Sequence, residues 1–230
     1  VGGGAEDSLS VSNIGTNAGE IGFNGTNVAF GGTTIGTING ANNGLNGNSL
    51  VIDLNANSTP ASIDALIQAL TYGNNSDNPT GSRSVSITVS DGDVGITNAA
   101  TSVITVTSEN DAPTAVNDTG TVQQDATLNV NQANGVVDNN DTDPDTGDTL
   151  TITGVRTGAE GAAVGNSNVG SNLVGTLGTL TLNANGSYSY VADQAAADAL
   201  ALNATADDTF TYEISDGNGG TDQAELTIAV

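Results

Sequence analysis

The chain has 230 residues and a formal net charge of −24, with two arginines and no lysine, histidine or cysteine. So acidic a surface repels nucleic acid and anionic membranes, because binding to either needs lysine or arginine against phosphate. Without cysteine, neither a disulfide framework nor a thiolate metal site can form. No run of 18 apolar residues is present, so no membrane-spanning helix is expected. The charge favours divalent cations as partners.

Aromatic residues make up 3% of the chain and tryptophan is absent. A core must therefore be built from valine, isoleucine, leucine and alanine, which favours thin β-sandwiches over an α/β enzyme.

The first half begins with 50 residues rich in Gly, Asn and Thr. Its clearest element is a helix, because Thr59 suits the N-cap and Pro60 the first helical position. We expect this helix to close one end of a sandwich. Its apolar face follows helical spacing at Ile63, Leu66, Ile67 and Leu70. Strands are expected at 9–11, 27–30, 50–54, 84–89 and 103–106, and turns at 31–32, 39–40, 55–57 and 90–93.

The second half repeats this order after a break at Pro113, which ends strand pairing on its N–H side. We place the domain boundary there and predict domains of residues 1–111 and 112–230. Residues 87–92 match residues 212–217, which lie 125 positions later, as two copies of one fold would. In this half, strands are expected at 126–130, 149–153, 180–182, 187–191, 209–214 and 224–228, and a helix at 194–202.

Residues 138–148 carry the densest charge, with five aspartates in eleven residues and no basic residue among them. Carboxylates this close repel one another unless a cation lies between them. Oxygen ligands on alternate residues suit Ca²⁺, which takes about 6–8 of them. The stretch is not an EF-hand, since Thr146 and Ile152 stand where that loop needs Gly and Glu. Two interpretations remain at this point, a calcium site and a solvated acidic loop.

A set of short motifs follows in order along the second half. They are residues 117–118 (ND), 140–145 (NDTDPD), 178–183 (GTLTLN), 186–190 (GSYSY), 208–212 (DTFTY) and 215–220 (SDGNGG). Together they resemble the cadherin-like and VCBS-type repeats of large bacterial surface adhesins, many of the RTX kind. The first half is similar to a related cadherin-like repeat through residues 76–79 and 90–93, but it has no aspartate-rich loop.

The resemblance implies an all-β fold: two tandem Ig/cadherin-like, seven-stranded Greek-key β-sandwiches, each with a short helix. It also implies Ca²⁺ at or near their junction. In such a sandwich the acidic loop and the turn at 216–218 both return to the linker end, where Asp77 of the preceding domain is also expected. Asp91 and Asp93 are equally expected as calcium ligands and as ordinary turn residues. The predicted calcium ligands are Glu109, Asn110, Asp111, Asp138, Asn140, Asp141, Asp143, Asp145, Asp148, Asp77, Asp216 and Asn218.

The expected function is a calcium-rigidified extracellular repeat module, a spacer or adhesive segment of a bacterial cell-surface or biofilm adhesin. Its partners would be neighbouring repeats of the same chain and cell-surface or matrix components, with no nucleic acid and no membrane insertion. The alternative is a self-assembling surface-layer or matrix-fibre subunit, in which edge strands accept a donated strand. A ligand-recognition module is a further alternative without a supporting motif. An enzyme such as a glycosidase is disfavoured, because histidine, cysteine and lysine are absent and few aromatic residues remain for sugar stacking.

Overall fold

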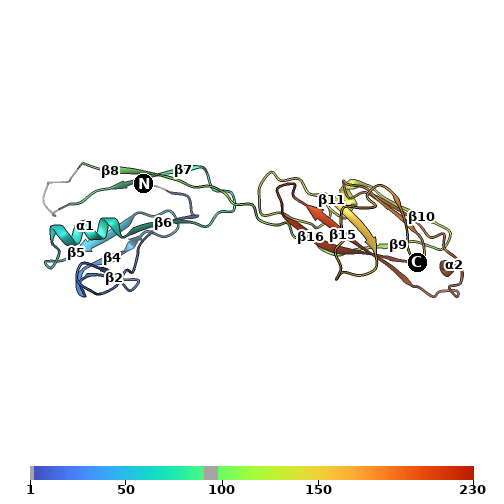
Figure 1. The fold of residues 1–230 in the computed structure, drawn as a ribbon, viewed down its shortest axis with the longest axis horizontal. Coiled ribbons are helices and arrows are strands. Elements are labelled where there is room, and N and C mark those ends of the chain that lie inside the picture. Colours follow the sequence, from blue (N-terminus) through green and yellow to red (C-terminus); the bar gives the residue numbers. More distant parts are fainter. Residues whose placement is uncertain (1–2, 91–97) are drawn as a thin grey trace. The chain divides into compact units, whose positions relative to one another are not determined.

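A computed structural model describes residues 3–90 and 98–230 of the chain (Figure 1). The chain divides into two compact units, Val1–Ser108 and Glu109–Val230, each of which is described by itself. The division falls before Glu109, whereas we expected it after Asp111. Residues 109–111 therefore belong to the second unit, in which Asn110 donates to Asp216 and the backbone N–H of Asp111 donates to Asp145. Among the described residues, no helix is both long and apolar enough to cross a membrane.

The described residues of the first unit form one helix and eight strands, and the strands make three small antiparallel sheets (Figure 1). The four-stranded sheet contains β2 (Ile21–Phe23), β3 (Asn27–Phe30), β4 (Thr33–Asn43) and β5 (Leu50–Leu54). The two pairs are β1 (Asp7–Val11) with β6 (Leu70–Asn74), and β7 (Ser82–Ile87) with β8 (Ala100–Thr105). Its fully buried core is small and comprises Val11, Ile21, Val28, Ile35, Leu66 and Ala69.

Helix α1 (Pro60–Gln68) begins where the sequence predicts. The side chain of Thr59 accepts from the backbone N–H of Ser62, whose hydroxyl in turn accepts from the N–H of Thr59, so the cap is reciprocal. The apolar face is narrower than expected, because Leu66 is buried while Ile67 is 38% exposed. Leu70 lies in β6, since the helix ends at Gln68.

One further detail of the first unit differs from expectation. Asn39 and Gly40 form no separate turn but lie within β4, whose pairing with β5 is irregular between Ile38 and Asn43. The side chain of Asn39 accepts from the backbone N–H groups of Ala41 and Asn42 there, which gives the strand its local distortion. The expected turn at 90–93 falls largely outside the described residues.

The second unit is a sandwich of two four-stranded sheets. One has the order β11 (Thr151–Thr157), β15 (Asp207–Ser215), β16 (Thr221–Ala229), β9 (Asp118–Thr121). The other has the order β10 (Thr127–Val130), β14 (Tyr188–Val191), β13 (Thr179–Leu182), β12 (Asn172–Val174). A single 3₁₀ turn, η1 (Gln132–Asn134), precedes the acidic loop.

Alternating side chains of both sheets fill the space between them, as the period-2 pattern predicts. Tyr190, Phe210 and Tyr212 are completely buried there, and the rings of Tyr190 and Phe210 meet edge to face with centroids 6.1 Å apart. The all-β expectation is confirmed. Each unit has eight strands among the described residues instead of seven, and α2 (Ala195–Asp198) is shorter than the helix predicted at 194–202.

Strand pairing brings two loops to one end of the second unit. The first residue of β11, Thr151, pairs with the last residue of β15, Ser215. The acidic loop before β11 and the turn after β15 are therefore neighbours. Thr114, just after the start of this unit, exchanges backbone hydrogen bonds with Thr142 in the acidic loop. This end of the sandwich carries the charged site.

Candidate metal centre

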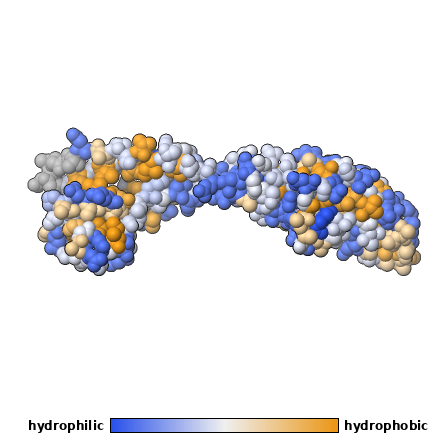
Figure 2. Space-filling view, viewed as in Figure 1, coloured by the Kyte–Doolittle hydropathy of each residue, from blue (hydrophilic) through white to orange (hydrophobic). Residues whose placement is uncertain are grey.

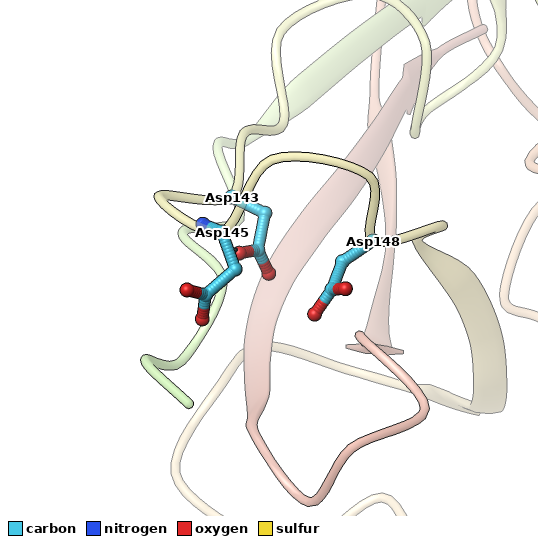
Figure 3. Close-up of side chains that lie close together, drawn as sticks. All are labelled: Asp143, Asp145 and Asp148. Atoms are coloured by element: carbon cyan, nitrogen blue, oxygen red, sulfur yellow. Dashed lines mark hydrogen bonds between the residues drawn. The ribbon is translucent and has the colours of Figure 1, made fainter. Parts of the chain in front are cut away.

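Three carboxylates of the acidic loop converge on one point. Each of Asp143, Asp145 and Asp148 offers an oxygen, and these oxygens all lie within 4.8 Å of one another. Figure 3 shows the three side chains pointing to the same side of the loop. All three are partly buried, and they line a depression whose wall includes Gln132, Asp138, Leu150 and Asn185. Neither arginine of the chain lines this depression.

Hydrogen bonds from the protein fix the orientation of these carboxylates. The backbone N–H of Asp145 donates to Oδ1 of Asp143 at 2.7 Å. The backbone N–H of Asp111 donates to Oδ2 of Asp145, also at 2.7 Å. The side-chain amide of Asn218 donates to Oδ2 of Asp148 at 2.9 Å. The acidic loop, residues 109–111 and the turn after β15 therefore meet at the cluster.

Two buried polar atoms of the acidic loop have no hydrogen-bond partner among the described residues. Oδ1 of Asn140 and Oδ2 of Asp143 are both buried and unpaired within the described part of the chain. An unsatisfied buried oxygen costs about 1–3 kcal/mol, and more when it is charged. A hard cation at the three carboxylates would supply the positive partner that Oδ2 of Asp143 lacks.

Asp216 is 5% exposed and anchors the turn between β15 and β16. The side-chain amide of Asn110 donates to it at 2.8 Å, and so do the backbone N–H groups of Asn218, Gly219 and Gly220. The Asn110 amide and these backbone N–H groups lower the pKa of Asp216 although burial opposes them. Asp216 therefore shapes the turn and binds residue 110 through neutral donors, and its role as a calcium ligand stays a prediction.

Asp141 and Asp118 form a second acidic pair, built around Tyr212. The phenol hydroxyl of Tyr212 donates to Oδ2 of Asp118 at 3.0 Å and lies 3.5 Å from both oxygens of Asp141. The backbone N–H of Val116 donates to Asp141 at 2.8 Å. Burial, reinforced by the charges of Asp118 and Asp222, raises the pKa of Asp141 to about 6 although this N–H opposes the shift. Burial also raises the pKa of Asp118.

The structure thus gathers most of the predicted ligands at one end of the second unit. Glu109 is exposed at its start, and Asp138 is exposed on the rim of the depression. Asp77 is exposed in the first unit, between β6 and β7, so its participation stays a prediction. Asp91 and Asp93 lie outside the described residues. Three residues that ligand spacing did not single out also belong to this end: Asp118, Tyr212 and Asp222, of which Asp222 accepts from the N–H of Ala115.

The sequence gives a signal for Asp118 but none for the contact that Tyr212 makes. Asp118 belongs to the Asn-Asp pair at 117–118, a sequence signal that carries no ligand spacing. Tyr212 lies in an ordinary alternating strand, so only the tertiary structure reveals its contact with Asp118.

Residues 110–230, more than half of the chain, match the bacterial cadherin-like domain family. The chain belongs to the bacterial cadherin-like domain family. Cadherin-like domains generally bind calcium, and they are typically non-enzymatic extracellular modules.

The other comparisons add little. No curated protein matches the chain. Among solved structures, an endo-fucoidan hydrolase of glycoside hydrolase family 107 aligns with 16% identity and a TM-score of 0.26. The alignment covers 85% of this chain but 26% of the hydrolase, so the chain spans about a quarter of that structure's length. A similarity this low carries no information about function.

Proposed function

We propose that the second unit binds Ca²⁺ through Asp143, Asp145 and Asp148, and that the chain is a calcium-rigidified extracellular repeat module. In this proposal it serves as a spacer or adhesive segment of a bacterial cell-surface or biofilm adhesin. Its partners are neighbouring repeats of the same chain and cell-surface or matrix components. Membership in the bacterial cadherin-like family supports an extracellular role.

One observation carries the calcium assignment. One oxygen from each of three carboxylates lies within 4.8 Å of the others, and one of these side chains has a buried oxygen with no hydrogen-bond partner in the described part of the chain. Two bare carboxylates about 4 Å apart repel by about 1 kcal/mol in water, and more where water is excluded. The chain has no histidine or cysteine. The oxygen-only ligand set therefore favours a hard cation, and its irregular loop suits Ca²⁺ better than the strict octahedron of Mg²⁺.

Cation binding also explains how the site would stiffen the start of the unit. The ion neutralises Asp145, which already accepts from the backbone of Asp111, and Asp148, which accepts from Asn218. Three chain segments would then be joined through one charge centre. A dissociation constant of about 10⁻⁴–10⁻³ M, which is typical of extracellular modules, suffices for this role.

Calorimetric titration of Ca²⁺ into the whole chain tests the assignment. We expect Asp143→Asn to abolish one binding site while the far-ultraviolet circular dichroism stays unchanged. Asp207→Asn is the matched control, because Asp207 is exposed at the opposite end of β15 and about 30 Å from Asp216 at about 3.3 Å per residue. Equal binding by the wild type and Asp143→Asn would overturn the assignment.

A further inference from the structure

Seven asparagines of the chain are followed directly by glycine, at positions 24, 39, 43, 46, 134, 185 and 218. In such a pair the backbone nitrogen of the glycine can attack the side-chain carbonyl carbon of the asparagine, Cγ. The two groups are close in one short segment, and glycine has no side chain to hinder the approach. The seven pairs have the same local chemistry, so their surroundings in the fold decide which of them reacts.

The attacking nitrogen is engaged in a hydrogen bond at five of the seven pairs. The N–H of the glycine donates to a backbone carbonyl in four of them, at Gly44, Gly47, Gly135 and Gly186. The N–H of Gly219 donates to Oδ1 of Asp216 at 3.0 Å. Attack at these positions first requires the hydrogen bond to break, and the net stabilisation by one hydrogen bond corresponds to about a two- to tenfold lower rate.

Asn39 is constrained in a different way, because it lies within β4. Its Oδ1 accepts from the backbone N–H groups of Ala41 and Asn42, and its Nδ2 donates to Oδ2 of Asp53 on β5 at 3.1 Å. Ring closure requires rotation of the backbone and the side chain of the asparagine. The strand and the hydrogen bonds at both ends of the amide oppose this rotation.

Asn24 has neither constraint. It is exposed in the turn between β2 and β3, and the N–H of Gly25 makes no hydrogen bond within residues 3–90 and 98–230. Gly25 has a φ of +92°, and apart from its chain neighbours no atom lies within 4 Å of the place where a Cβ would be. Figure 2 shows hydrophilic residues at the surface of the part of the first unit where Figure 1 labels β2. Both the nucleophile and water therefore have access to this amide.

Two backbone N–H groups also face the oxygen on which charge would develop. Oδ1 of Asn24 accepts from the N–H of Asn27 at 2.7 Å and from the N–H of Thr26 at 3.1 Å. When the nitrogen of Gly25 adds to Cγ, this oxygen becomes negatively charged, and donors already in place stabilise such a charge. The turn holds the donors, because the backbone N–H of Asn24 donates to the carbonyl of Asn27 and closes it.

We propose that Asn24 is a self-modification site, at which the nitrogen of Gly25 displaces the side-chain amide and forms a succinimide. The N–H of Gly25 loses its proton to water, and its nitrogen forms a bond to Cγ. The bond between Cγ and Nδ2 breaks, and Nδ2 takes a proton from water and leaves as ammonia. One water molecule then opens the ring. Hydrolysis at Cγ gives aspartate, and hydrolysis at the backbone carbonyl carbon gives isoaspartate.

The two products have different consequences for the first unit. Aspartate keeps a carboxylate oxygen for the N–H groups of Thr26 and Asn27. Isoaspartate adds one atom to the backbone of the turn, directly beside two buried core residues, Ile21 on β2 and Val28 on β3. The β2–β3 pair should therefore loosen as isoaspartate accumulates. This reaction does not involve the acidic loop, so it is independent of calcium and of the proposed function.

Peptide mapping by mass spectrometry tests the proposal on the whole chain, incubated in EDTA at neutral and at mildly alkaline pH. We expect conversion of Asn24 to be about two- to tenfold faster than that of Asn185 and Asn218, which are also exposed but precede an engaged N–H. The rate should rise with pH, because the attacking nitrogen must lose a proton. Asn24→Gln should fold normally and show no conversion at this position, since its longer side chain would need a larger ring.

The same measurement in urea separates the effect of the fold from that of the local sequence. The glycine N–H groups are all free in the unfolded chain, so the rates of the seven pairs should converge. Equal rates at Asn24, Asn185 and Asn218 in the folded chain, or an unchanged advantage of Asn24 in urea, would overturn the proposal. Because EDTA is present throughout, the result does not depend on whether the acidic loop binds calcium.

Discussion

The backbone N–H of Asp111 donates a 2.7 Å hydrogen bond to Oδ2 of Asp145, 34 residues away. This bond ties the first residues of the second unit to the acidic loop through the main chain. A charge-assisted bond of this kind is about twice as strong as a neutral one. The orientation of the Asp145 side chain therefore depends on the backbone N–H of residue 111 and not on the side chain of residue 111.

Replacing the N–H at residue 111 should weaken calcium binding. Asp111→Pro removes the donor, which frees Asp145, and loss of such an orienting bond typically costs 10–100-fold in metal affinity. We expect about a tenfold rise in the dissociation constant by calorimetry. Asp111→Ala is the control, since it keeps the N–H and removes the carboxylate alone. If Asp111→Ala weakens binding as much as Asp111→Pro, the side chain is the ligand and the backbone bond is unimportant.

Calcium should raise the melting temperature of the second unit. A ligand that binds only the folded state adds about 1.4 kcal/mol at tenfold excess over its dissociation constant and about 2.7 kcal/mol at hundredfold excess. Differential scanning calorimetry in calcium and in EDTA measures the difference. Asp143→Asn should melt at the same temperature in both, and a wild type that also shows no difference would argue against a bound ion.

Without calcium, the second unit should lose stability as pH rises between about 4 and about 6. The pKa of Asp141 is about 6 in the folded chain, above its ordinary value of 3.8. The folded state therefore binds more protons than the unfolded state in this window, and the free energy of unfolding falls as the pH rises. The total is at most about 3 kcal/mol, since one pKa unit corresponds to about 1.36 kcal/mol.

Urea denaturation at pH 4 and pH 6 measures this loss, with EDTA present throughout. Asp141→Asn should flatten the pH dependence, leaving the part that comes from Asp118. Calcium should flatten it as well, because a nearby cation favours the ionised carboxylate. A stability that rises with pH over this window in EDTA would contradict the assignment.

Asp208 should stabilise the second unit independently of any metal. It is 3% exposed and accepts from the backbone N–H groups of Thr176, Leu177 and Gly178 and from the hydroxyl of Tyr190. Asp208→Asn turns an amide donor toward N–H groups that need an acceptor. We expect a loss of about 2–4 kcal/mol, equal in calcium and EDTA.

Tyr190→Phe is the graded comparison for Asp208, because it removes one of these donors and keeps the carboxylate. Its loss should be smaller, at about 1–2 kcal/mol. Chemical denaturation measures both variants, and a neutral Asp208→Asn would show that the buried carboxylate has no structural role.

Arg83 should stabilise the first unit in the same metal-independent way. Its Nε lies 2.7 Å from Oδ2 of Asp7, whose side chain is 7% exposed. Burial alone would raise the pKa of Asp7, but hydrogen bonds from Tyr72, Arg83 and Asn74 outweigh it and hold the pKa below its usual range. Arg83→Ala leaves that carboxylate without its cation, so we expect the free energy of unfolding of the first unit to fall.

Hydrogen exchange, measured as the temperature rises, distinguishes unfolding of the first unit from unfolding of the second. Arg156→Ala is the matched control, since it removes the other arginine, whose guanidinium donates to the carbonyls of Thr157 and Ala159 in the second unit. Exchange in β1 and β6 should accelerate in Arg83→Ala and not in Arg156→Ala. Equal effects of both variants would mean that the ion pair with Asp7 contributes little.

The sequence predicted the elements whose signal is local. Thr59 and Pro60 mark the start of α1 through cap chemistry, and the alternation along 209–214 marks β15, because burial on one face of a strand imposes a period of two. It missed β2, β9 and β12, which have three or four residues each and too few side chains to show a period. It also missed β4, which is rich in Gly, Asn and Thr, and β6, which begins at Leu70, a residue that fitted the helical spacing of α1. Asn39 and Gly40 suggested a turn by composition, but they lie within β4, in the irregular part between the pairs Ile38–Ile52 and Asn43–Leu50.

The candidate site also combines features that the sequence determines with features that only the tertiary structure determines. The sequence by itself determined its chemistry: 26 acidic residues, oxygen ligands on alternate positions, and no histidine or cysteine to bind a softer metal. Only the tertiary structure decided which carboxylates meet. It brings Asp148 to Asn218 and Asp111 to Asp145, and it assigns Asp216 to a turn that neutral donors satisfy. The physical reason is that charge is a property of each residue, whereas contacts across 34 or 70 positions depend on the register of paired strands.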